Sequence, residues 1–131
     1  MAIKEDKIFR FTREEHLKSK KSIDLLFLKG KGISANPVRL VYLSSEGPWI
    51  LPKVLFSVSK RNFKKAVDRN RIKRQMREVY RLSRDFYFST ENDKSYLLAF
   101  IYTAKEKIPY NVLEKKLNLT LERLKIKNNQ A

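Results

Sequence analysis

The segment from Lys60 to Arg84 holds the side chains whose chemistry is easiest to interpret. It contains eleven Lys or Arg residues and only two acids, Asp68 and Glu78. Guanidinium and ammonium groups bind phosphate, and the planar guanidinium can do so with two parallel hydrogen bonds or can stack on a base. Cations spaced three and four residues apart on a helix repel one another. This density of unbalanced positive charge therefore indicates a surface that binds a polyanion.

The apolar residues of the same segment recur with the period of a helix. Ile72, Met76, Val79 and Tyr80 are spaced at i, i+4, i+7 and i+8, which places them on one face. The spacing predicts a helix over Asn70–Arg81. The opposite side, within an arc roughly 100° wide, holds a polar set that we call the cationic rail. Its members are Asn70, Lys73, Arg74, Arg77, Arg81 and Arg84.

The whole chain is small and basic, and it has enough apolar residues to form a core. Its 131 residues favour one domain, 42% of them are hydrophobic, and 30 Lys and Arg against 14 Asp and Glu give a formal charge of +16. Such a charge favours nucleic acid as the partner, with an anionic membrane surface as the competing interpretation. The basic segment lacks the bulky aromatic edge of an interfacial helix, which favours nucleic acid.

The chain has no cysteine, which excludes disulfides, thiolate metal ligands and cysteine nucleophiles. No apolar run approaches the roughly 20 residues of a membrane span, and the first residues have no signal-peptide core. The sequence therefore predicts a cytoplasmic protein without membrane contact.

Residues suited to catalysis are few and scattered. Only Glu14–Glu15 and Glu91/Asp93 place two acids close together, and His16 is the only histidine. A two-metal site needs several converging carboxylates, and a general base needs an orienting partner. The phosphate-binding patterns GxxxxGK[ST] and GxGxxG are both absent from the sequence. We expect these acids and His16 at the surface, with no catalytic residue, metal or cofactor on the protein itself.

The remaining periodicities predict a mixed α/β sandwich, with helices packed on one small sheet. Thr12 and Glu15 have capping-box spacing, and Gly30 fits the C′ position of the first helix. Ile33–Asn36 could add a short edge strand. The predicted helices and strands are helix Ser19–Lys29, strands Val38–Leu43, Lys53–Val58 and Tyr96–Tyr102, and helix Tyr110–Lys127, with a polar connection over 85–94.

Aromatic side chains give the second indication of a nucleic-acid partner, because single-stranded RNA is held by stacking beside a cationic groove. Tyr42 is the better solvent-facing candidate. Phe27 is as well explained by a place in the core. Phe56, Phe100 and Ile101 are predicted to be core residues.

Two strings of residues make the chain recognisable. FSVSKR at 56–61 and AVDRNRIKRQMRE at 66–78, preceded by LFLKG at 26–30, resemble the protein subunit of bacterial ribonuclease P. The resemblance covers residues 17 to 127. Where that family usually has a turn glycine before the basic helix, this chain has Phe63-Lys64-Lys65. Ile23 stands at a position that is often aromatic in the family.

The resemblance implies both a fold and a division of labour. The fold is a ribosomal-protein-like α/β two-layer sandwich in αβββαβα order, with a small mixed sheet and a left-handed βαβ crossover. A catalytic RNA subunit, which requires Mg²⁺, removes the 5′ leader of precursor tRNA, and the protein is a noncatalytic subunit that binds that RNA and the leader. We expect a charged extension at 1–16, one RNA-binding domain at 17–127 and a polar tail at 128–131.

The resemblance and the basic segment together give the predicted site residues. The RNA-binding set is Arg69, Asn70, Arg71, Lys73, Arg74, Arg77, Lys60, Arg61 and Arg81. The leader cleft, between the first helix and the sheet, is Ile23, Phe27, Leu40 and Tyr42. A structural or ribosomal-type RNA-binding protein without a role in tRNA processing is the alternative. Oligomeric state is not predicted.

Overall fold

The computed structural model describes residues 11–45, 52–88 and 95–130. Glu91 and Asp93, which we predicted at the surface, lie outside these ranges. The observed order of elements is the predicted αβββαβα, preceded by one turn of 3₁₀ helix. The elements are η1 (Arg13–Glu15), α2 (Lys20–Lys29), β1 (Lys31–Ala35), β2 (Val38–Ser45), β3 (Lys53–Val58), α3 (Ala66–Tyr87), β4 (Ser95–Tyr102) and α4 (Tyr110–Gln130).

The four strands form one mixed sheet in the order β1-β2-β4-β3. β1 and β4 each pair antiparallel with β2, whereas β3 pairs parallel with β4. The chain crosses from β3 to β4 through α3, and this crossover is left-handed, against the usual right-handed rule. β4 is buried on both faces, as its continuous apolar run predicted.

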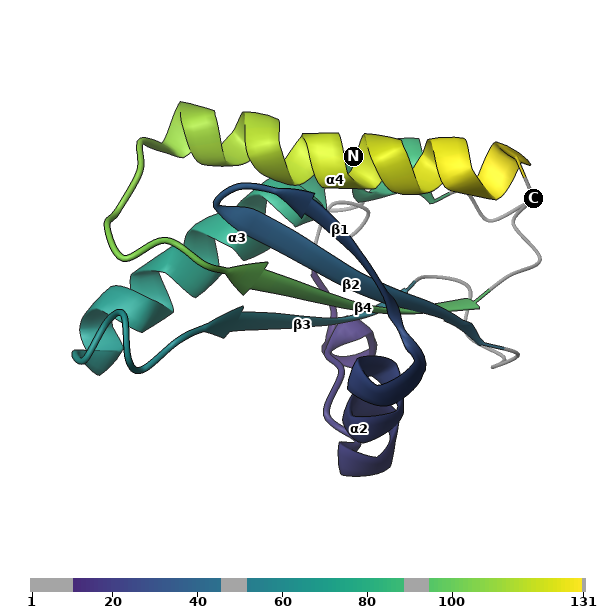
Figure 1. The fold of residues 1–131 in the computed structure, drawn as a ribbon, viewed down its shortest axis with the longest axis horizontal. Coiled ribbons are helices and arrows are strands. Elements are labelled where there is room, and N and C mark those ends of the chain that lie inside the picture. Colours follow the sequence, from purple (N-terminus) through teal and green to yellow (C-terminus); the bar gives the residue numbers. More distant parts are fainter. Residues whose placement is uncertain (1–10, 46–51, 89–94, 131) are drawn as a thin grey trace, which may run out of the picture.

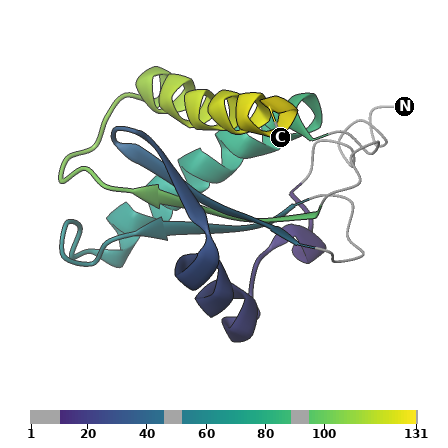
Figure 2. The ribbon, with the colours of Figure 1, turned by 45° about the vertical axis from the view of Figure 1, so that its right-hand side comes forward.

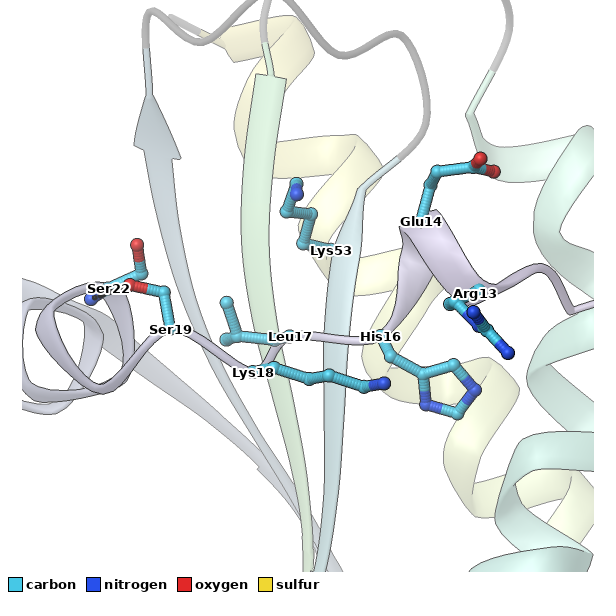
Figure 3. A pocket seen from close by; sticks show the side chains of 8 residues that line it. All are labelled: Arg13, Glu14, His16, Leu17, Lys18, Ser19, Ser22 and Lys53. Carbon is cyan, nitrogen blue, oxygen red and sulfur yellow. Dashed lines mark hydrogen bonds between the residues drawn. The ribbon is translucent and has the colours of Figure 1, made fainter.

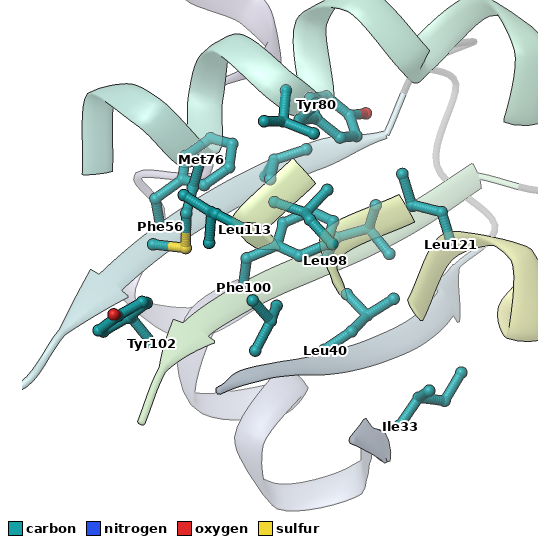
Figure 4. Close-up of a cluster of buried hydrophobic side chains, with 14 of the residues drawn as sticks. Ile33, Leu40, Phe56, Met76, Tyr80, Leu98, Phe100, Tyr102, Leu113 and Leu121 are labelled. Atoms are coloured by element: carbon teal, nitrogen blue, oxygen red, sulfur yellow. The ribbon is translucent and has the colours of Figure 1, made fainter. Parts of the chain in front are cut away.

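Helices cover the two faces of the sheet unequally (Figures 1 and 2). α3 and α4 lie together on one face, and α2 lies on the other. The larger core fills the space between the sheet and the α3/α4 layer, where Tyr80, Met76 and Leu113 meet Phe100 and Leu98 (Figure 4). This packing confirms the apolar stripe of the basic helix, because Ile72, Met76, Val79 and Tyr80 are all nearly inaccessible to solvent.

α3 is longer than the periodicity predicted. It begins at Ala66 and runs to Tyr87, into the stretch that we predicted as a polar connection. Phe88 ends the helix by donating its backbone N–H to the carbonyl of Arg84, at 2.8 Å, and its ring is buried in the larger core. Burial of Phe88 and Arg84 keeps the last turns of α3 against the rest of the molecule.

α2 is held on the other face by very close packing. Its Leu26 is fully buried against Val41, Leu97 and Ala99 in a smaller core. Gly30 follows the helix in extended conformation (φ −69°, ψ 158°), so the left-handed cap expected of a C′ glycine is not formed. A Cβ at Gly30 would lie only 2.2 Å from the carbonyl oxygen of Leu26, so this glycine is required because the backbones approach so closely.

The segment before α2, residues 11–17, packs onto the domain, and we call it the N-terminal strap. Phe11 contacts the rings of Phe56 and Tyr80 edge to face. Leu17 donates its backbone N–H to the carbonyl of Val54 at 3.0 Å. The packed part of the chain therefore begins by Phe11, earlier than the boundary at residue 17 that we predicted.

Candidate nucleic-acid interface

The cationic rail points away from the core because the apolar stripe of α3 is buried on the opposite side. Asn70, Arg71 and Arg74 are exposed, and Lys73 and Arg77 are half-buried. None of the four cations has an acidic partner among the described residues. These cations are therefore available to pair with the phosphates of a bound polyanion.

The two acids of the basic segment pair with other cations, and not with Lys73, Arg74 or Arg77. Asp68 pairs with Lys107 at 2.8 Å, and the hydrogen bond from Lys107 lowers the pKa of the Asp68 carboxyl. Glu78 accepts hydrogen bonds from Arg81, which lower the pKa of the Glu78 carboxyl. Arg81, predicted to contact RNA, therefore presents a partly neutralised charge.

Arg84 is the one member of the rail that the structure removes from the surface. Its guanidinium donates to both carboxylate oxygens of Glu15, at 2.8 and 2.9 Å, and both side chains are 3% exposed. Glu15 also accepts from the backbone N–H and the hydroxyl of Thr12, which fulfils the predicted Thr12–Glu15 pairing. The prediction of Glu15 as a surface acid is wrong, because the buried cation of α3 fixes it inside.

Arg69 has a structural partner as well as a predicted contact with RNA. Its Nη1 donates to the carbonyls of Phe63 and Lys64, at 2.7 and 2.9 Å. The Phe63 ring is buried and lies 5.9 Å from that of Tyr102. A buried ring and a guanidinium thus stabilise the turn where the family usually has glycine. Lys60 and Arg61 are exposed at the start of this turn.

The predicted leader cleft is only partly assembled. Ile23 packs against the smaller core beneath α2, and Phe27, one turn later, is 48% exposed. Leu40 is fully buried in the larger core, and Tyr42 packs against the same core. Both are therefore on the α3/α4 side of the sheet, so their prediction as cleft residues beside α2 is corrected.

The face of the sheet that lies against α2 is formed by the strand residues that alternate with those of the larger core. Val41 and Leu43 of β2 and Leu55 of β3 belong to the smaller core, together with Ile101, which was predicted as a core residue and is half-buried. Phe56 and Phe100 are core residues on the other face, as predicted. Sequence reasoning did not identify Arg39 on this face.

Arg39 is an exposed cation that lies over Gly32 of the neighbouring strand. Atoms of its guanidinium group lie 3.0–3.5 Å from the place where Gly32 would carry a Cβ, so the missing side chain leaves room for it. Arg39 alternates with Val38 and Leu40, whose burial is complete. The strand period alone indicates that Arg39 and Leu40 face opposite sides, but only the packing shows which side is open.

Neither a metal-binding group nor a membrane-spanning helix is observed in the described ranges. Across residues 11–45, 52–88 and 95–130, no three His, Cys, Asp or Glu side chains come together in a group that could bind a metal ion. None of the helices in the same ranges has both the length and the apolar character needed to span a bilayer.

These features define a class of protein: a small basic α/β domain in which the crossover helix of a mixed sheet presents unpaired cations. Residues 11–125 match the family model described as Ribonuclease P, and the chain belongs to that family. The chain is therefore a subunit of a ribonuclease, since its relatives are ribonuclease P protein components.

The similarity extends over most of the chain. The component from Porphyromonas gingivalis is 31% identical over 119 residues, which are 88% of this chain and 87% of the relative. That from Chlorobaculum tepidum is 36% identical over 103 residues, 71% of this chain and 67% of the relative. RNase P proteins from Staphylococcus aureus and Thermotoga maritima share the fold, with TM-scores of 0.68 and 0.67. The Staphylococcus aureus protein is 19% identical, and the match covers 84% of this chain and 94% of that protein. The Thermotoga maritima protein is 20% identical, and the match covers 82% of this chain and 96% of that protein.

Proposed function

We propose that this chain is the noncatalytic protein subunit of the ribonuclease P ribonucleoprotein. In this function it binds the catalytic RNA subunit and the 5′ leader of precursor tRNA, so that removal of the leader gives the mature tRNA 5′ end. The observation that carries the proposal is the set of unpaired cations on α3: the rail residues Lys73, Arg74 and Arg77, with Arg71 beside the rail, have no acidic partner among the described residues, on a helix held in place by a buried stripe. The family supports the same assignment.

The two surfaces of the molecule have different tasks in this proposal. The exposed part of the rail, with Lys60 and Arg61, binds the phosphates of the RNA subunit. The open sheet face beside α2 receives the leader, with the half-exposed Phe27 as the stacking surface and Ile23 beneath it. In this proposal the chemistry belongs to the RNA subunit and its Mg²⁺, and the complex works in the cytoplasm.

Reconstitution tests who performs the chemistry. Single-turnover cleavage of precursor tRNA is measured with protein alone, RNA subunit alone and both together, each with Mg²⁺ and at saturating enzyme. Protein alone should not cut, whereas the reconstituted complex should cut at the mature 5′ end. Cleavage by RNA-free protein would refute the proposal. Binding of RNA without any effect on cleavage would instead favour a structural, ribosomal-type protein.

Phe27→Ala tests the leader surface within the same assay. Loss of one stacked base should weaken precursor tRNA roughly tenfold and leave mature tRNA unchanged, because only the precursor carries a leader. Phe86→Ala is the matched control, since Phe86 is an aromatic residue of α3 that is 71% exposed. An equal loss for precursor and mature tRNA would remove Phe27 from the leader surface.

A further inference from the structure

A pocket of about 350 Å³ lies where the N-terminal strap reaches the start of α2 (Figure 3). His16 lines one end of it, with the side chains of Lys18 and Arg13 on different sides of the imidazole. Lys53 and the first residues of α2, Ser19 and Ser22, complete the lining with Glu14 and Leu17. Figure 3 shows the carboxylate of Glu14 pointing away from the imidazole.

The pocket is close to the rail of α3. The ring of Phe11 packs edge to face on His16, with centroids 4.5 Å apart. The same ring lies 6.0 Å from the guanidinium carbon of Arg77. The Nε of Arg77 is buried without a hydrogen-bond partner among the described residues. His16 therefore has a cation of the rail on one side and Lys18 on the other.

In the described part of the chain, the two acids of the strap do not neutralise the cations around His16. Glu15 is committed to Arg84 and Thr12 inside the protein. Glu14 is the other acid of the strap that lines the pocket. Against it stand Arg13, Lys18 and the neighbouring Arg77. A cluster of cations around an ionisable imidazole is arranged to receive an anion from outside.

We propose that the Arg13–His16–Lys18 pocket binds a phosphodiester of RNA and so connects the α3 rail to the α2 side of the molecule. This inference rests on the proposed RNA-binding function and extends it to residues 13–18, which lie outside the basic segment. His16 would donate a hydrogen bond to the phosphate as imidazolium, flanked by the charges of Lys18 and Arg77. The phosphate can come from the RNA subunit or from the leader of precursor tRNA.

The ionisation of His16 gives this site a measurable property. In the free protein, burial lowers the pKa of His16, Arg77 and Lys18 lower it further, and Glu15 opposes them. The imidazole is therefore neutral at pH 7 before RNA binds. A phosphate among these cations removes their net repulsion and raises the pKa. Binding then takes up a proton, so affinity should rise as pH falls through the interval between the two pKa values and level off on either side.

The direct experiment is an NMR titration of the imidazole. His16 is the only histidine of the chain, so its ring resonances report one site. The pKa of His16 is measured with the protein free and with a saturating single-stranded RNA that has the leader sequence. In parallel, the affinities of the RNA subunit and of precursor tRNA are measured between pH 5.5 and 8. The RNA that supplies the phosphate is the one whose affinity depends on pH.

Three variants separate the site from a structural role. His16→Gln should lose the pH dependence and weaken binding roughly tenfold at low pH, the cost of one charge-assisted hydrogen bond. His16→Arg should keep the low-pH affinity at every pH, because its charge is permanent. Lys115→Ala removes an exposed cation from α4 and should leave both affinity and pH dependence unchanged.

The outcomes distinguish this site from the proposed function. A raised pKa with a pH dependence that disappears in both His16 variants supports the pocket. Normal RNA binding with an unchanged pKa and the same pH profile in His16→Gln overturns the pocket and leaves the proposed function intact. Failure of the wild-type protein to bind either RNA overturns both.

Discussion

Glu15 and Arg84, 69 residues apart in the sequence, form a buried ion pair in which both carboxylate oxygens of Glu15 accept from the guanidinium. The pair joins the N-terminal strap to the last turns of the basic helix. Two buried charges of opposite sign gain little over an apolar pair, but either one alone is expensive to keep away from water. The pair therefore makes the position of the strap depend on α3.

Glu15→Gln should destabilise the fold by up to about 3–5 kcal/mol, because the exposed carboxylate of Asp85, 3.3 Å from the Nε of Arg84, is a poorer counter-charge for the buried guanidinium than Glu15. Urea denaturation at pH 7 measures the free energy of unfolding. Glu14→Gln is the matched control, because the Glu14 carboxylate is next to Glu15 in the sequence but is exposed. This control should change the free energy of unfolding by less than about 0.5 kcal/mol. Equal stability of the two variants would show that the strap is not anchored by this pair.

At the level of residues, the sequence predicted features that depend on local spacing better than it predicted which distant residues pair. The stripe of α3 and the pairing of Thr12 with Glu15 both follow from local spacing. Arg84 did not, because helical geometry places it on the rail and only a carboxylate from another segment draws it inside. Ion pairs between distant residues leave no periodic signal in a sequence.

α3 is the element in which sequence and structure agree most closely. A helix repeats every 3.6 residues, so Ile72, Met76 and Val79 can face the core while Lys73 and Arg74 face away. The one-sided burial of the stripe then decides which cations are available to a partner. The helix is a rigid support for the rail. RNA binding therefore loses less conformational entropy than it would if the same cations were on a flexible segment.

Lys73→Ala combined with Arg74→Ala should impair assembly with the RNA subunit without unfolding the protein. Each lost phosphate contact should lower the salt slope of RNA affinity by about one, so the double variant should lose about two. Lys105→Ala with Lys115→Ala is the charge-matched control, because both residues are exposed outside α3. The same loss in both double variants would mean that net charge, and not the rail, determines binding.

β2 shows why a strand is harder to interpret than this helix. Val38, Leu40 and Tyr42 alternate with Val41 and Leu43, so apolar residues occur on both faces. Shifting the assignment by one residue exchanges the faces, and the strand period gives no preference. Contact with α2 on one side and with the larger core on the other decides the question, which is why Leu40 and Tyr42 were placed in the wrong cleft.

The molecule as a whole distributes its charge unevenly. The basic segment from Lys60 to Arg84 carries +9 of the formal +16, since it has eleven cations and two acids. In the proposed complex, RNA binding releases the counterions condensed on phosphates. Affinity for the RNA subunit should fall on the order of a thousandfold between roughly 50 and 200 mM salt if about six phosphates are contacted. A nearly flat salt titration would show that the cationic surface is not the binding surface.

The central position of β4 governs how this chain can fold as it leaves the ribosome. β4 pairs with both β2 and β3, and it follows the entire basic helix in the sequence. A nascent chain that ends before Ser95 has the β1-β2 pair, the separate strand β3 and a cationic helix whose apolar stripe lacks the central strand of its sheet. Such an intermediate exposes apolar surface and is prone to aggregate. The sheet can therefore be completed only after β4 is synthesised, because β4 is the strand that joins β2 to β3.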